Sequence, residues 1–178
     1  MKKLILPLLI SLAIFSSVAM ADNNNLDQRL IIPSSQPVVS ASPAYTSGDN
    51  VGGKLTFSVC LGKMGTAEIR GVMIWDLAKQ GQDLDLVLFR SDPASTTFTD
   101  NSSLDIADGD IEKIAAVIPI TTQKGFNDNG VTLVDSISVP VFCNSSRLLY
   151  GAIVARNAST LQYSATTDLS LALKAFLN

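Results

Sequence analysis

Four acidic residues fall close together in the chain, and their side chains are of the kind that binds calcium. They are Asp105, Asp108, Asp110 and Glu112. Calcium is a hard ion that takes several oxygen ligands, often from one flexible loop. The order departs from an EF-hand loop, because Gly109 separates two aspartates and no glutamate lies at the required distance. The cluster could therefore hold calcium, with helix capping and a solvated turn as the alternative.

Two further carboxylates, Asp83 and Asp85, share one face of an expected strand. Paired carboxylates can act as acid and base in glycoside hydrolysis, but exposed strand carboxylates are far commoner. The chain has no histidine, which is the commonest general base and the commonest zinc ligand. Nothing in the sequence marks a nucleophile activated in another way. We therefore predict no catalytic residues, no enzyme activity and no cofactor apart from calcium.

The two cysteines, Cys60 and Cys143, are predicted to form a disulfide. In an oxidising compartment a lone pair is more often bonded than part of a metal site, which needs more soft ligands. A disulfide between them would close a loop of about 83 residues and stabilise the fold by about 4 kcal/mol. The alternative is two unpaired, buried thiols.

The first 21 residues have the layout of a secretory signal peptide. Lys2 and Lys3 precede an apolar stretch at 4–15, and the small side chains of Ala19 and Ala21 fit signal peptidase. The apolar stretch is shorter than the roughly 20 residues that span a bilayer. We predict cleavage near Ala21 and export to the periplasm or the extracellular space, with no stable membrane insertion afterwards.

Composition limits the classes of partner. The 178 residues carry a net charge of −3, so the chain offers no basic surface for nucleic acid. With 47% hydrophobic and 16% charged residues, it is neither a disordered chain nor a coiled coil. Its length suits one domain with its own core.

The chain divides into a polar arm and one domain. Residues 22–43 are polar and interrupted by prolines, which predicts an arm or linker in which 30–32 and 38–39 could add an edge strand. Residues 44–178 are predicted to form a single domain. In it, short apolar runs with a two-residue period alternate with turn residues. Strands are predicted at 54–61, 67–78, 83–90, 116–121, 131–142, 148–155 and 168–176.

This pattern predicts an all-β fold: an antiparallel β-sandwich or jelly roll of about seven to eight strands. One short helix is predicted at 108–116, where acidic residues near its start suit the helix dipole. Strict alternation over 67–78 places Ile69, Met73 and Trp75 on one face of that strand and Val72 with Ile74 on the other.

Three segments resemble small β-sandwich virion structural proteins of tailed bacteriophages and prophages, of the capsid-associated or decoration-like kind. The segments are "SPAYTSGDNVGGKLTF" at 42–57, "LDLVLFRSDPASTTFTDNSSLDIADGDIEKIAAVIPI" at 84–120 and "LYGAIVARNASTLQYSATTDLSLAL" at 149–173. The resemblance implies a sandwich fold and a packing role in a virion, without an activity. The export signal, the polar arm and the cysteine pair depart from that family.

The sequence thus predicts a non-enzymatic structural or interaction protein, exported and disulfide-stabilised, that contacts other virion or cell-surface proteins or itself. The virion is the alternative location. The alternative function is a secreted carbohydrate- or cell-surface-binding module that uses calcium and aromatic side chains. Its stacking platform would comprise Trp75, Tyr45, Tyr150 and Tyr163, for which core packing is the competing interpretation.

Overall fold

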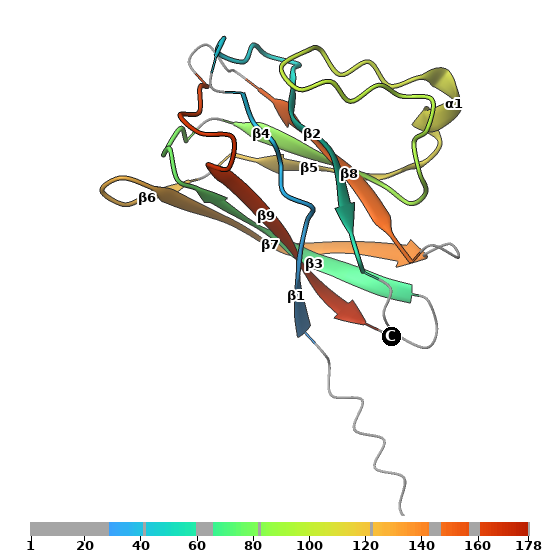
Figure 1. Cartoon of the computed structure of the whole chain (residues 1–178). Helices are drawn as coiled ribbons and strands as arrows, with labels where there is room; N and C mark the ends of the chain where they lie inside the picture. The colour runs from blue at the N-terminus through green and yellow to red at the C-terminus, as the bar shows by residue number, and fades with distance from the viewer. Residues whose placement is uncertain are drawn as a thin grey trace, which may run out of the picture.

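The described residues form two antiparallel sheets packed face to face, which confirms the predicted all-β sandwich (Figure 1). The computed structural model describes residues 29–40, 42–59, 66–81, 83–121, 123–142, 147–156 and 161–177. The predicted signal peptide at 1–21 and the predicted disulfide between Cys60 and Cys143 lie outside these ranges.

Among the described residues, one sheet has five strands in the order β1-β9-β3-β7-β6 and the other has four in the order β2-β8-β4-β5. The strands of the first are β1 (Arg29–Pro33), β9 (Leu169–Leu177), β3 (Thr66–Asp76), β7 (Gly130–Phe142) and β6 (Lys124–Gly125). Those of the second are β2 (Asn50–Phe57), β8 (Leu149–Ala155), β4 (Leu84–Phe89) and β5 (Ile114–Ile120). A single-turn helix, α1 (Asp108–Ile111), lies between β4 and β5.

Several element boundaries differ from the sequence-based expectation, and two of the differences have a clear physical reason. The helix ends at Ile111 instead of 116, because the apolar residues from Ile114 onward pair with β4 as strand β5. Strand β2 begins at Asn50 instead of 54, since Gly52 and Gly53 adopt positive φ angles inside the strand and shift its register against β8. A glycine pair that resembles a turn in the sequence is therefore a β-bulge.

A bulge in β3 decides which of its side chains face the core. Both pairings of β3 shift register between Ile69 and Gly71. Arg70 is the extra residue against β9, whereas against β7 the extra residues belong to β7, at 136–138. Ile69, Val72 and Ile74 therefore share the core face. The strict alternation predicted for this strand is wrong beyond Ile69, because Met73 and Trp75 lie on the opposite face.

The four-stranded sheet is buried on both faces. Its inner face contributes residues such as Leu86 and Ile153 to the core between the sheets. Its outer face carries a second cluster that includes Phe89 and Tyr150. The segment between β4 and β5, which bears α1, packs over this cluster through Phe98 and other apolar residues (Figure 1). This sheet thus has a cover made from its own chain.

The described part of the predicted arm belongs to the sandwich. Strand β1 pairs with β9 as the expected edge strand, and Ile32 and Val39 are buried. The backbone N–H of Ser35 donates to the carbonyl of Thr56 at 2.8 Å, which ties the segment to β2 of the other sheet. Residues 29–40 therefore close one side of the sandwich.

Replacing a core leucine is expected to destabilise the fold strongly. Leu86 is fully buried between the sheets, so Leu86→Ala removes apolar contacts and leaves a cavity that costs about 2–5 kcal/mol. Leu77→Ala is the matched control, because Leu77 is 57% exposed and its loss should stay within about 0.5 kcal/mol. Urea unfolding of both variants measures the difference, and equal losses would contradict the core assignment.

Candidate functional site

The four acidic residues of the predicted calcium site do not converge. Asp105, Asp108 and Glu112 are exposed, whereas Asp110 is fully buried. In the part of the chain that the structure describes, no group of three or more His, Cys, Asp or Glu side chains lies close enough to hold a metal ion. Their proximity in sequence thus does not become a shared set of ligands in space.

Asp110 instead fastens α1 to the preceding loop. Its carboxylate accepts hydrogen bonds from Lys113 Nζ at 2.7 Å, from Thr96 Oγ1 at 2.8 Å and from the backbone N–H of Ser95 at 2.9 Å. The hydrogen bond from Lys113 is the main cause that lowers the pKa of Asp110. The carboxylate is therefore a structural anion with its own protein partners.

A second, partly buried network joins two of the segments that carry the phage-protein resemblance. Asp100 Oδ1 accepts hydrogen bonds from Tyr45 Oη at 2.7 Å and from the Gly52 backbone N–H at 2.6 Å. Ser40 Oγ donates to the other carboxylate oxygen. Burial raises the pKa of Tyr45 above its usual range, so the phenol stays a neutral donor. These polar residues hold the loop against β2.

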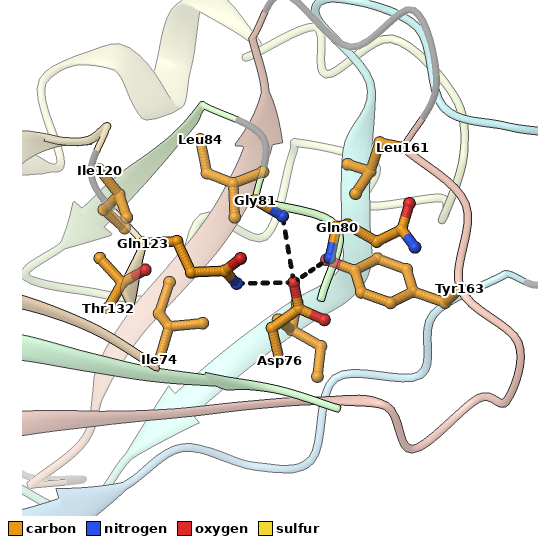
Figure 2. A pocket seen from close by; sticks show the side chains of 11 residues that line it. Ile74, Asp76, Gln80, Gly81, Leu84, Ile120, Gln123, Thr132, Leu161 and Tyr163 are labelled. Atoms are coloured by element: carbon orange, nitrogen blue, oxygen red, sulfur yellow. Dashed lines mark hydrogen bonds between the residues drawn. The ribbon is translucent and has the colours of Figure 1, made fainter. Parts of the chain in front are cut away.

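A small cavity lies at one end of the sandwich, around Asp76 (Figure 2). Its volume is about 10 Å³, roughly the space of one water molecule. Burial, followed by the nearby charge of Asp76, raises the pKa of Tyr163 on the cavity wall. A cavity of this size does not admit an organic substrate.

Donors from this chain surround the carboxylate of Asp76 (Figure 2). Oδ2 accepts hydrogen bonds from the backbone N–H of Gln80 at 2.6 Å and from Gln123 Nε2 at 2.8 Å, with Gly81 N at 3.4 Å. Oδ1 accepts from the backbone N–H of Ala78 at 3.0 Å. The aspartate thus fixes the turn after β3 and links it to the segment before β6.

The other candidate residues from the sequence analysis do not form a site either. Asp85 pairs with Arg156, at 2.7 Å between Oδ2 and Nε. Tyr45, Tyr150 and Tyr163 are buried, so they do not form a stacking platform with Trp75 at the surface. The competing interpretation, core packing, is correct for the three tyrosines.

An apolar surface that the sequence analysis missed lies on the outer face of the five-stranded sheet. In register, Met73 of β3 stands between Leu133 of β7 and Ala172 of β9. In the next row, Trp75 stands beside Val131. We call these five residues the outer patch. Leu133 is 49% exposed, whereas Met73, Trp75 and Val131 are partly exposed and Ala172 is buried. No described segment covers the patch as the α1-bearing segment covers the other sheet.

The border of the outer patch carries charges that are paired within the chain. Lys174 Nζ lies 2.6 Å from Asp135 Oδ1, across Gly71. A side chain at Gly71 would press on both partners and on the backbone of β7, so glycine is needed for this close approach. Arg70 and Glu68 form a second pair at 3.1 Å. These two pairs add no net charge.

The sheet edges, in contrast, are poor sites for adding a strand. Strands β1, β5 and β7 each contain a proline, namely Pro33, Pro119 and Pro140. Proline lacks the N–H that an added strand would use, and β7 is further interrupted by a register shift near Ser136, which has a positive φ. The exposed sheet face is therefore the better candidate for contact with a partner.

No family model matches the chain, and no curated protein or solved structure matches it either. Within the described ranges, no helix has the length and apolar character needed to cross a bilayer. The basis for a functional assignment is therefore the geometry of the chain itself: acidic groups occupied internally and an apolar sheet face left open.

The dependence of folding stability on acid pH tests the role of Asp110. A carboxyl with a lowered folded-state pKa adds stability that is present above its unfolded value, 3.8, and is lost as the pH falls through the lower folded value. Asp110→Asn should thus lower stability at pH 7 and flatten its decline below about pH 4. Asp108→Asn, an exposed change in the same helix, is the control. Chemical unfolding at several pH values measures both, and an unchanged slope for Asp110→Asn would refute the assignment.

Removing the carboxylate of Asp76 should weaken the joint between β3 and β6. Asp76→Ala leaves buried N–H groups without an acceptor, at a cost of about 1–3 kcal/mol in unfolding free energy. Gln123→Ala keeps the backbone hydrogen bonds and should cost less. Thermal and urea unfolding compare the two variants. A larger loss for the glutamine variant would show that packing, and not the carboxylate, holds this end together.

Proposed function

We propose that this protein is a non-enzymatic structural or interaction protein that makes its contacts through the outer patch. The observation that carries the proposal is a sheet face with apolar residues at its centre and paired charges at its border. Sheet faces exposed in this way mark sites of protein contact. Protein interfaces have the same arrangement, with an apolar core inside a polar rim.

Three acidic groups that are hydrogen-bonded within the chain support a structural role. Asp76, Asp100 and Asp110 each accept hydrogen bonds from at least one backbone N–H and from one or more side chains of the same chain. A general acid or base needs an open path to substrate. Each of these carboxylates is already fully engaged in holding a turn or loop, and the only cavity described around any of them has room for about one water.

The resemblance to virion proteins supplies the class of partner. We propose that the chain is an exported, disulfide-stabilised relative of capsid-associated phage proteins, and that its partners are other subunits of a particle or of a cell surface. The second hydrophobic layer over the four-stranded sheet leaves the five-stranded sheet as the face available for such contacts. A module that binds carbohydrate is the competing function.

Fractionation of a strain that produces the protein tests this proposal. We expect the mature chain to begin near Asp22 and to sediment with protein particles in a density gradient. Leu133→Lys should lower the particle-bound fraction at least tenfold, because it places a charge in the outer patch. Val117→Lys, at a similarly exposed position on β5 of the other sheet, should leave the fraction unchanged.

Two results would contradict the proposal. The wild-type protein could stay at the top of the gradient under all conditions, or the two lysine variants could sediment alike. Binding to a glycan array that survives Leu133→Lys would favour the carbohydrate-binding alternative.

A further inference from the structure

We propose that the outer patch binds a second copy of this chain, with the two five-stranded sheets stacked face to face. The inference rests on the proposed function only in using the same surface. In such a dimer, one twofold axis lies between the sheets and runs parallel to β3. The patch is then isologous, which means that each copy presents the same residues to the other.

This symmetry places unlike strands over each other. A half-turn about an axis along β3 brings β3 over β3 and carries the β7 side of one sheet over the β9 side of the other. Residues that stand level in the strand register stay level after the rotation. Aligned sheets pack about 10 Å apart at roughly 30° because of their twist, so the correspondence holds best near the centre, at Gly71 and Met73.

The side chains at these superposed positions complement each other in size. Leu133 and Ala172 flank Met73 at one level, so the half-exposed leucine of each copy lies over the small alanine of the other, which is already buried in its own sheet. At the next level Val131 and Ser170 flank Trp75, and again a larger residue of β7 faces a smaller one of β9. Alternation of large and small residues lets facing layers interdigitate.

The charges at the same interface are also complementary. Asp135 and Lys174 flank Gly71 at one level, so each lysine faces the aspartate of the second copy as well as that of its own chain. Four charges would then alternate in sign around the two glycines. A chain with a net charge of −3 repels its copies in general. The outer face adds no net negative charge to this repulsion, because the two ion pairs cancel and Lys124, level with Val131, is basic.

Edge-to-edge pairing is the competing route to a dimer, and the prolines of β1, β5 and β7 disfavour it. An extended peptide from another protein is the competing occupant of the face. It would not require the reciprocal match between Lys174 and Asp135, so the charges distinguish the two cases.

A pair of charge reversals tests the dimer. The protein, expressed from its full sequence and purified, is studied by sedimentation velocity over a range of concentrations. We expect wild-type dimers, and we expect Lys174→Glu alone and Asp135→Lys alone to be monomeric, because each homodimer would place like charges together. An equimolar mixture of the two variants should form dimers, since every facing pair is then of opposite sign.

Leu133→Lys provides a second test that does not depend on the charge pair. It should raise the dimer dissociation constant at least tenfold, with Val117→Lys as the matched control that dimerises like wild type. Thermal unfolding confirms that each variant is folded, and if a charge reversal unfolds, the two lysine variants decide the question.

Wild-type protein that is monomeric at all concentrations would overturn the dimer, as would single charge variants that dimerise like wild type. These failures are separable from failure of the proposed function. A monomer that still sediments with particles refutes only the dimer, whereas a dimer that never joins particles refutes only the particle role.

Discussion

One extra residue in β3 decides which side chains of this strand face the core and which lie on the outer face of the five-stranded sheet. The bulge at Arg70 reverses the alternation of side chains beyond Ile69, so Val72 and Ile74 enter the core and Met73 and Trp75 leave it. Without the bulge, Met73 and Trp75 would point into the space between the sheets. The same shift brings Asp76 inside, where backbone N–H groups meet its carboxylate. The outer patch and the buried joint therefore have one cause.

Although charged residues are few, three carboxylates that are buried or partly buried fix the loops of the fold. Asp76, Asp100 and Asp110 each collect N–H or O–H donors from segments distant in sequence, as when Asp100 joins Tyr45 and Gly52 to its own loop. A buried charge is costly unless it is paired and hydrogen-bonded, so each group constrains its loop to one geometry. Apolar packing holds the sheets together, whereas these anions define the connections between strands.

Most of the strands could be predicted from the sequence because short apolar runs repeat with a two-residue period between turn residues, as in Leu84, Leu86 and Leu88 of β4. The bulges could not, since Gly52 with Gly53 resembles a turn and Arg70 resembles an ordinary outward residue. The outer patch could not be predicted either. Its members come from three strands, and only the register places Met73 beside Leu133 and Ala172. The acidic residues at 105–112 are close in sequence but form no shared set of metal ligands, because proximity in sequence does not make side chains converge.

The contrast between the two outer faces is the strongest argument that the open one is used. Phe89 and Tyr150 lie on the outer face of the four-stranded sheet, where the long segment between β4 and β5 covers them. Asp110 fixes α1 within that segment. The fold thus has the means to shield an apolar sheet face within one molecule. No such cover lies over Met73, Trp75 and Leu133 in the described ranges, although exposed apolar area lowers solubility. The outer face of the four-stranded sheet is largely covered, with Val117 of β5 as an exposed exception. The absence of such a cover over the outer patch in the described ranges is best explained by a partner that completes it.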